Sequence, residues 1–279
     1  MDDFLGFARA HGILIDPGKF YPSSKIQRCP TADKPRSDNG AWFWDGERGW
    51  VMDWAGDARP TWYGKKREWT PADKAAWIRQ RDEETRRLER QYADARVRAH
   101  TKLQNCELKE HGYLQLKGFP EEKGLVDQEH LFIPMRDVSS NDLIGYQEIH
   151  WTGSKWEKKM LWGMKAKGAV FRMGTSSPVW LVEGYATGLS VRAALRAAGL
   201  PGSVTVCFSA NNLVHVADKI PGERYVFADN DQSKTGQEAA KATGLPWTMA
   251  DEEGWDANDL HKNRGLFSVL QKVMTCKKT

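Results

Sequence analysis

The chain has 279 residues, enough for one large or two modest domains with sizeable hydrophobic cores. Its 41 Lys+Arg and 37 Asp+Glu residues give a net charge of +4, which is too mildly basic to identify a nucleic-acid-binding protein by itself. The four cysteines are too scattered for a Cys-x-x-Cys half-site, so we expect no zinc. The sequence has no signal peptide, and no apolar run approaches the roughly 18 residues of a membrane span, so we expect a cytoplasmic protein without a membrane partner.

Residues 1–69 predict a small β module rich in tryptophan. Turn sequences at Asp45-Gly46 and Gly56-Asp57 favour an antiparallel sheet in this segment. Seven of the thirteen tryptophans lie within residues 42–77, interleaved with the basic residues Arg48, Arg59, Lys65, Lys66 and Arg67.

The aromatic side chains of this module have two alternative roles. Alternating aromatic residues commonly form the core of a small twisted sheet. Exposed rings instead stack on unpaired bases, which contributes about 1–3 kcal/mol per base, while neighbouring cations hold the phosphate backbone. The candidates for this second role are Trp42, Trp44, Trp50, Trp54 and Trp62.

Residues 70–106 predict a long, charged connecting helix. Thr70 is a candidate N-cap, Pro71 suits the first helical position, and no further glycine or proline occurs before Gly112. Charged residues dominate positions 79–98, with a narrow apolar stripe at Trp77, Leu88, Tyr92 and Ala95. Such a helix either exposes a salt-bridged face to solvent or contacts nucleic acid through its arginines.

Residues 107–175 predict a basic subdomain of mixed secondary structure. Its positive charges are concentrated toward the end of the segment, at Lys155, Lys158, Lys159, Lys165, Lys167 and Arg172. A stretch of this kind either grips phosphates or forms the solvated face of a hairpin.

Residues 176–279 predict an α/β domain, within a chain that is α+β overall. Short apolar runs at 179–182, 204–208 and 225–227 are typical of buried parallel strands. Helical patterns follow them, and they occupy residues 186–198, 211–220 and 235–243. The alternation of strand and helix predicts a parallel sheet covered by helices.

Acidic residues follow these strands at the points where the strands end. Glu183 follows the first apolar run, Asp229 and Asp231 follow the third, and Asp256 lies further along the chain. We expect them to converge, because the carboxyl ends of parallel strands meet at one edge of a sheet. Mg²⁺ takes only one or two carboxylates per ion and keeps several waters, so the pattern predicts a magnesium site. The alternative for Asp229 and Asp231 is a solvated turn that caps the next helix.

Several motifs resemble those of a known family. Glu-Gly-Tyr-Ala-Thr at 183–187, Asp-Asn-Asp at 229–231 and Asp-Ala-Asn-Asp-Leu at 256–260 resemble, in order and spacing, the motifs of the TOPRIM domain of primases, topoisomerases and some nucleases. Residues 132–137 and 143–147 resemble the segment that precedes TOPRIM in primases. The chain is most similar to the TOPRIM DNA primases of phages and plasmids, and the likeness covers roughly residues 107–274.

The resemblance implies a set of site residues. Glu183, Asp229 and Asp231 would be catalytic and, with Asp256, would hold Mg²⁺ or alternatively Mn²⁺. Gly184 would let the backbone turn sharply beside the metal, whereas Asn258 and Asp259 would cap a helix running from Leu260. Residues implied in binding nucleotide or nucleic acid are Arg136, Lys158, Lys159, Lys165, Lys167, Tyr185 and Asn211.

The resemblance also implies an activity and partners. It implies synthesis of short RNA primers from nucleoside triphosphates on a single-stranded DNA template, in the cytoplasm of a bacterial host. No Gly-x-x-x-x-Gly-Lys-[Ser/Thr] motif is present, so we expect a separate replicative helicase. Without a zinc-binding domain, template selection would fall to the tryptophan-rich module or to a partner.

Two other function classes remain open. A TOPRIM nuclease would use the same carboxylates to cleave phosphodiesters, but it has no evident need for the segment around Arg136. A non-catalytic accessory protein that binds single-stranded DNA is the second alternative, and the intact acidic set argues against it. A topoisomerase is disfavoured, because the chain is too short for the gated enclosure of those enzymes.

Overall fold

The computed structural model describes residues 2–54, 56, 59–64 and 71–276, in two compact units that comprise Met1–Gln80 and Arg81–Thr279. Thr70, Asp57 and the basic residues Lys65, Lys66 and Arg67 lie outside the described residues, as does the side chain of Trp77. Within the described ranges, no helix is both long enough and apolar enough to cross a membrane.

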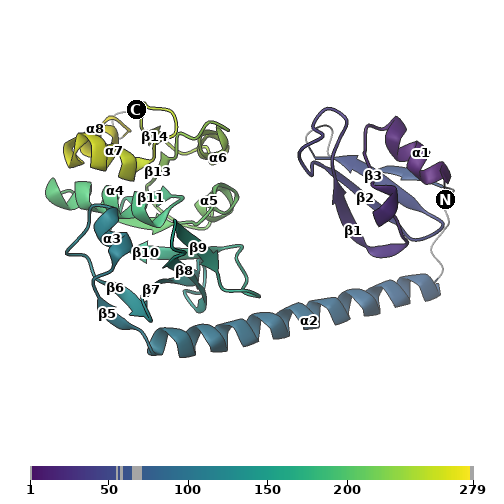
Figure 1. Cartoon of the computed structure of the whole chain (residues 1–279), viewed down its shortest axis with the longest axis horizontal. Helices are drawn as coiled ribbons and strands as arrows, with labels where there is room; N and C mark the ends of the chain where they lie inside the picture. Colours follow the sequence, from purple (N-terminus) through teal and green to yellow (C-terminus); the bar gives the residue numbers. More distant parts are fainter. Residues whose placement is uncertain (1, 55, 57–58, 65–70, 277–279) are drawn as a thin grey trace. The chain divides into compact units, whose positions relative to one another are not determined.

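The first unit is built around a small antiparallel sheet, as predicted. Its strands pair in the order β1-β2-β3-β4, and the first three are labelled in Figure 1. The backbone amides of Glu47 and Arg48 donate hydrogen bonds to the Asp45 carboxylate, which closes the predicted turn between β2 and β3. The elements are α1 (Asp2–Ala10), η1 (Pro17–Lys19), β1 (Ser23–Cys29), β2 (Gly40–Trp44), β3 (Gly49–Asp53) and β4 (Thr61–Tyr63).

The predicted connecting helix is confirmed as α2 (Pro71–Gln104), which is 34 residues long. Its apolar stripe differs from the prediction, because the fully buried residues are Ala95 and Ala99, whereas Leu88 and Tyr92 are half-buried. The two alanines are one helical turn apart, and their small side chains let this part of α2 pack closely against Met135 and Phe132 within the second unit. The helix therefore docks through its C-terminal part, while most side chains of residues 81–98 remain exposed.

The second unit contains one ten-stranded sheet that continues across the predicted domain boundary at 175/176. Strands β12, β11, β13 and β14 are parallel neighbours, and β10 joins them to the antiparallel strands β5–β9. The antiparallel part comprises β5 (Glu107–Lys109), α3 (Gly112–Leu116), β6 (Gly124–Asp127), β7 (His130–Asp137), β8 (Leu143–Trp151), β9 (Trp156–Met160) and β10 (Ala169–Met173).

The parallel part confirms the predicted α/β fold. Helices α4, α7 and α8 cover one face of the sheet, and α5 and α6 cover the other (Figure 1). The elements are β11 (Val179–Val182), α4 (Tyr185–Ala197), β12 (Ser203–Val206), α5 (Ala210–Ala217), β13 (Arg224–Ala228), α6 (Thr235–Ala242), β14 (Trp247–Met249), α7 (Ala257–Arg264) and α8 (Leu266–Cys276).

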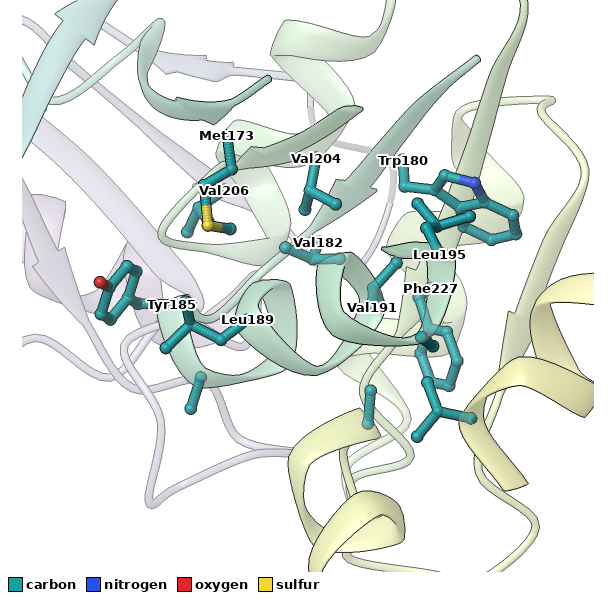
Figure 2. Packing of buried hydrophobic residues seen from close by; sticks show 14 of the residues in the cluster. Met173, Trp180, Val182, Tyr185, Leu189, Val191, Leu195, Val204, Val206 and Phe227 are labelled. Carbon is teal, nitrogen blue, oxygen red and sulfur yellow. The ribbon is translucent and has the colours of Figure 1, made fainter. Parts of the chain in front are cut away.

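Alternation along β11 explains why both faces need a helical layer. Trp180 and Val182 are fully buried on the α4 side, and Leu181 is fully buried on the α5 side. Figure 2 shows the packing on the α4 side, where burial of each such side chain contributes about 1.5–3 kcal/mol. Gly188 lets α4 lie close to the sheet, because a Cβ there would be 2.7 Å from Met173 Cε and 2.9 Å from Val206 Cγ2.

Candidate active site

Carboxylates from separate segments meet at the carboxyl edge of the parallel strands. Glu183 follows β11, Asp229 follows the neighbouring strand β13, and Asp256 begins α7 shortly after β14. The charges of Asp256, Glu183 and Asp231 all act on the Asp229 carboxyl, so the four lie near one another. We call Glu183, Asp229, Asp231 and Asp256 the acidic edge.

Asp229 is the most strongly perturbed member of the acidic edge. Burial, followed by the negative charges of Asp256 and Glu183, raises the pKa of its carboxyl to about 8, and Lys158 opposes the shift. Its Oδ1 atom is buried and has no hydrogen-bond partner among the residues that the structure describes. A buried carboxylate oxygen without a partner is costly, and a bound cation would relieve that cost.

Glu183 resembles Asp229 in its surroundings. Burial, followed by the negative charge of Asp231, raises the pKa of its carboxyl, and Lys158 again opposes the shift. Within the described part of the chain, no hydrogen bond engages the Glu183 carboxylate, so its oxygens remain available for a ligand.

Asp231 has the capping role that was the alternative to metal binding. Its carboxylate accepts hydrogen bonds from the backbone amides of Thr235 (3.1 Å) and Gly236 (2.9 Å) at the start of α6, and from the Ser233 hydroxyl. The Ser233 hydroxyl and the Gly236 amide hold the pKa of Asp231 below its usual value. Asp231 therefore stabilises the fold locally, whatever further role it has.

Asp256 is also a helix cap, which corrects the predicted start of the last motif's helix. The helix begins at Ala257 rather than Leu260, and Asp256 and Asp259 form a reciprocal capping box. The Asp256 Oδ1 atom accepts hydrogen bonds from the backbone amides of Asn258 (2.7 Å) and Asp259 (2.8 Å), and its Oδ2 atom accepts one from the Thr187 hydroxyl (3.0 Å). Asn258 is buried, and its side chain donates hydrogen bonds to the Lys117 carbonyl and the Ser190 hydroxyl. It therefore links distant segments and does not cap the helix.

Two glycines contact the acidic edge in different ways. The chain bends at Gly184, between β11 and α4, as predicted, and it does so with an extended backbone of φ −98° and ψ 152°. Phe208 has a left-handed backbone, with φ 65° after β12, and its amide donates to the Glu183 carbonyl. Gly236 packs against the Asp229 backbone so closely that a Cβ there would overlap the Asp229 carbonyl oxygen.

The donor set of the acidic edge fits a hard divalent cation. Among the described residues, these carboxylates do not bring three ligand atoms within 4.8 Å of one another. Mg²⁺ does not require that, since it takes one or two carboxylates and completes its shell with water. The unpartnered Oδ1 of Asp229 and the unengaged carboxylate of Glu183 are the groups that would hold it.

Lys158 and Tyr113 complete the surroundings of the acidic edge. Lys158 is exposed on β9, and its charge reaches both Glu183 and Asp229. Its Nζ lies 5.8 Å from the centroid of the Tyr113 ring. The Tyr113 hydroxyl is buried, and no described residue hydrogen-bonds it. Burial, with a contribution from the charge of Asp256, raises the pKa of Tyr113 to about 12, and the charge of Lys117 opposes this shift. Sequence reasoning missed Tyr113, because no motif surrounds it.

The other predicted lysines are placed differently from Lys158. Lys159 lies on the opposite face of β9 and pairs with Glu157 at 2.9 Å. Lys165 is 3.6 Å from Asp137. Lys167 is exposed. Its charge acts on His215, whose pKa is lowered by the burial of His215 and then by the charges of Lys219, Lys167 and Lys165.

Arg136 lies at the same edge of the sheet as Glu183, three strands away. Strand β7 runs in the direction of β12, since both are antiparallel to β10, so Arg136 near the end of β7 reaches this edge. Arg136 donates to the Asn141 carbonyl at 2.9 Å, and Arg172 donates to the Asn141 side chain at 3.0 Å. These exposed guanidinium groups converge on one turn and form a positive surface beside Lys165 and Lys167.

Tyr185 and Asn211 have different degrees of exposure. The Tyr185 ring is buried and packs edge-on against Phe171 at 5.7 Å, with its hydroxyl directed away from the core (Figure 2). Its ring is therefore a core residue, which leaves no free face for a nucleotide. Asn211 is exposed, whereas the neighbouring Asn212 is buried and its side chain bonds Gly168, Ala169 and the Cys207 carbonyl.

The tryptophan candidates divide between the two faces of the four-stranded sheet. Trp42 and Trp44 are buried against Phe4, so the base-stacking role predicted for these two is wrong. The opposite face carries a row formed by Phe43, Trp50 and Trp62, which pair across consecutive strands. Trp62 is 60% exposed and Trp54 is 53% exposed, with the Arg28 guanidinium 5.4 Å from the Trp54 ring centroid.

A further exposed ring, which sequence reasoning missed, lies beside α2. Trp162 is 76% exposed, and Arg98 donates to its carbonyl at 2.7 Å while lying 5.9 Å from its ring centroid. The ring borders a cavity of about 460 Å³ that is lined by Arg87, Arg90, Gln91, Asp94, Arg98 and Trp162. The predicted arginine-rich face of α2 is thus combined with an aromatic side chain.

Comparison with known proteins gives structural likenesses alone. No family model matches the chain, and no curated protein matches it. A DNA primase domain from Pseudomonas aeruginosa is similar at 14% identity and a TM-score of 0.35, over 60% of this chain and 55% of that one, so the chain spans about half the length of that structure. The RNA polymerase domain of Mycobacterium tuberculosis primase DnaG, crystallised with a double-stranded DNA oligomer bearing an overhang, is similar at 16% identity and a TM-score of 0.35, over 67% and 72% of the two chains. A DnaG catalytic core is similar at 13% identity and a TM-score of 0.39, over 74% of each chain.

Proposed function

We propose that this chain is a DNA primase, which synthesises short RNA primers on single-stranded DNA by Mg²⁺-dependent nucleotidyl transfer in phage or plasmid replication. One observation carries the proposal. Glu183 and Asp229 follow neighbouring parallel strands with oxygens that no described hydrogen bond engages, and burial together with neighbouring negative charges raises the pKa of both carboxyls. Such an arrangement favours a divalent cation.

The side chains around this pair fit phosphate chemistry. Asp229 and Glu183 would hold the cation, either Mg²⁺ or Mn²⁺, and a bound ion would assist the attacking 3′-hydroxyl and neutralise charge on the leaving pyrophosphate. Lys158 is the cation whose charge reaches both carboxylates, and it would contact a triphosphate bound there. No covalent nucleophile is required.

The nucleic acid would follow positive charge and exposed rings. Arg136 and Lys167 lie at the edge of the sheet that carries Glu183, where they would contact the phosphates of template or primer. In the first unit, Trp50, Trp54 and Trp62 are the predicted stacking residues that are not buried. Trp162 with Arg98 would supply a further contact.

The products made on single-stranded DNA test this proposal. The purified protein is incubated with the DNA, all four NTPs, one of them labelled, and Mg²⁺ or Mn²⁺. We expect short labelled RNA that disappears in Glu183→Gln and persists in Glu223→Gln, a substitution of a carboxylate at the opposite end of β13. Shortened DNA without labelled product would instead identify a nuclease. Bound but unchanged DNA would identify an accessory protein, and either result would overturn the proposal.

A further inference from the structure

Three potential metal ligands gather on the antiparallel part of the second unit, away from the acidic edge. His130 comes from β7, and Glu148 and His150 come from β8. One ligand atom from each lies within 4.8 Å of the other two. Phe132 pairs with Glu148 and Leu131 pairs with Ile149, so alternation places His130, Glu148 and His150 on one face of the sheet. We call these three residues the histidine cluster.

The contacts within the histidine cluster leave one nitrogen without a partner. His130 Nδ1 is 2.5 Å from Glu148 Oε1, and the rings of His130 and His150 are stacked at 5.1 Å. His150 Nδ1 is 3.8 Å from the same Glu148 oxygen, and it is buried without a hydrogen bond to any described residue. This nitrogen therefore lies close to a carboxylate oxygen without being hydrogen-bonded to it.

Glu157 on β9 explains why this arrangement calls for a cation. Its Oε2 is 3.4 Å from His150 Nε2, and a carboxylate there favours a proton on Nε2. A neutral imidazole with that proton carries a lone pair on Nδ1, which then faces the lone pairs of Glu148. A metal ion between them removes the repulsion, and a carboxylate that orients a ligating histidine in this way is a common second partner in metal sites.

We propose that His130, Glu148 and His150 bind a divalent transition-metal ion of the zinc class. Two imidazole nitrogens and one carboxylate oxygen suit Zn²⁺ or Co²⁺ rather than Mg²⁺, which prefers oxygen ligands alone. Three protein ligands leave a coordination position for water. The side chain of His130 is 41% exposed, so an ion can enter from solvent. The expectation of no zinc rested on cysteine spacing, and this site uses no cysteine.

The ion would fix the β7–β8–β9 hairpins with respect to one another. Its ligands join β7 to β8, and Glu157 extends the contact to β9, which pairs with β8 alone among the described strands. Lys158 lies between Glu157 and Lys159, on the opposite face of β9, and its charge reaches the acidic edge. The proposed metal site therefore lies on the face of β9 opposite Lys158, whose charge reaches the candidate active site.

Titration of the metal-free full-length protein with Zn²⁺ and Co²⁺ tests this site. We expect one equivalent to bind at least 100-fold more tightly than Mg²⁺, with visible Co²⁺ absorption bands. Binding should be lost in His130→Gln and His150→Gln. It should persist in His100→Gln, which changes an exposed histidine of α2, and in Asp229→Asn, which changes the acidic edge. Binding that survives both cluster substitutions, or that is lost only in Asp229→Asn, would overturn the proposal.

A measurement on the unsubstituted protein guards against variants that fail to fold. One equivalent of Zn²⁺ should shift the imidazole proton resonances of His130 and His150 and leave that of His100 in place. Unmoved resonances of the two cluster histidines would refute the site, and would favour a protonated His130 that simply pairs with Glu148. Neither readout depends on primer synthesis, so failure here is distinguishable from failure of the proposed function.

Discussion

The acidic edge and the tryptophan-rich sheet both contain residues of one kind that have different surroundings. At the acidic edge, the oxygens of Asp231 and Asp256 accept hydrogen bonds that cap α6 and α7, while Asp229 retains an oxygen without a partner. In the sheet, alternation buries Trp42 and leaves Trp62 exposed. Residue type alone therefore identifies candidate functional residues. Their hydrogen-bond partners, or their place in the strand register, then show which side chains stabilise the fold and which are available to bind a ligand.

The largest expected effect separates the two faces of the four-stranded sheet. Trp42→Ala removes a buried ring from the core and should lower the free energy of unfolding by about 3–5 kcal/mol. Trp62→Ala should leave stability within about 0.5 kcal/mol and weaken binding of single-stranded DNA by about 1–3 kcal/mol. Denaturant unfolding and DNA titration of both variants measure the difference. Equal losses of stability would break the division between core and surface rings.

The next effect concerns Asp229. Asp229→Asn keeps the side-chain shape but removes the charge that would hold the cation, so primer synthesis should fall roughly 10²–10³-fold. The matched control is Asp218→Asn, an exposed carboxylate at the C-terminal end of α5, which should retain full activity. Initial rates at saturating NTP measure both. A fully active Asp229→Asn protein would remove Asp229 from the proposed site.

The raised pKa of Asp229 also predicts how stability depends on pH and metal. Below the ordinary pKa near 3.8, the Asp229 carboxyl is protonated in both the folded and the unfolded state, so this group costs no folding free energy. The free-energy cost of keeping it in the folded protein then grows until the pH passes the folded-state pKa of about 8. Stability from this group should therefore fall, on the order of a few kcal/mol, between pH 4 and pH 8. Mg²⁺ should raise Tm more at pH 8 than at pH 6, and Asp229→Asn should lose that difference. A Mg²⁺ effect independent of pH would contradict a cation bound at Asp229.

Lys158 and Lys159 provide a matched pair on the two faces of β9. Lys158→Ala removes a charge that reaches Glu183 and Asp229, so we expect primer synthesis to fall roughly tenfold. Lys159→Ala affects a residue paired with Glu157 and should change the rate little. Rates and the salt dependence of DNA binding measure the contrast. Similar losses in both variants would point to a general contribution of positive charge.

The smallest expected effect is the loss of the Asp231 cap. Asp231→Ala removes the acceptor of the Thr235 and Gly236 amides and should lower the free energy of unfolding by about 1 kcal/mol. Thermal unfolding checks this value. If Asp231→Ala abolishes synthesis without changing Tm, the residue serves the cation and its capping bonds are incidental.

The parallel sheet was predictable from sequence to within a few residues. The apolar runs at 179–182 and 225–227 are β11 and most of β13, because strands buried on both faces need continuous apolar residues. Convergence of the carboxylates followed from topology alone. The capping hydrogen bonds of Asp231 and Asp256 were harder to predict from the sequence, because they depend on the residues at which α6 and α7 begin.

Contacts between distant segments account for what the sequence did not reveal. Tyr113 lies near Asp256, more than a hundred residues away, and neither residue's neighbours indicate the pairing. Trp162 was missed because its partner Arg98 lies on α2, in a separate segment. The histidine cluster required the register of β7 against β8, which no pattern in residues 130–150 specifies.

The contact between Gly236 and Asp229 offers a way to recognise inactive relatives of this protein. Any larger side chain at position 236 would push against the Asp229 carbonyl and displace the residue proposed to hold the cation. A natural variant could thus keep every acidic residue of the motifs and still be inactive. Surveys of related genes that score only the carboxylates would count such a variant as active, whereas inspection of the residue five positions after Asp231 would identify it.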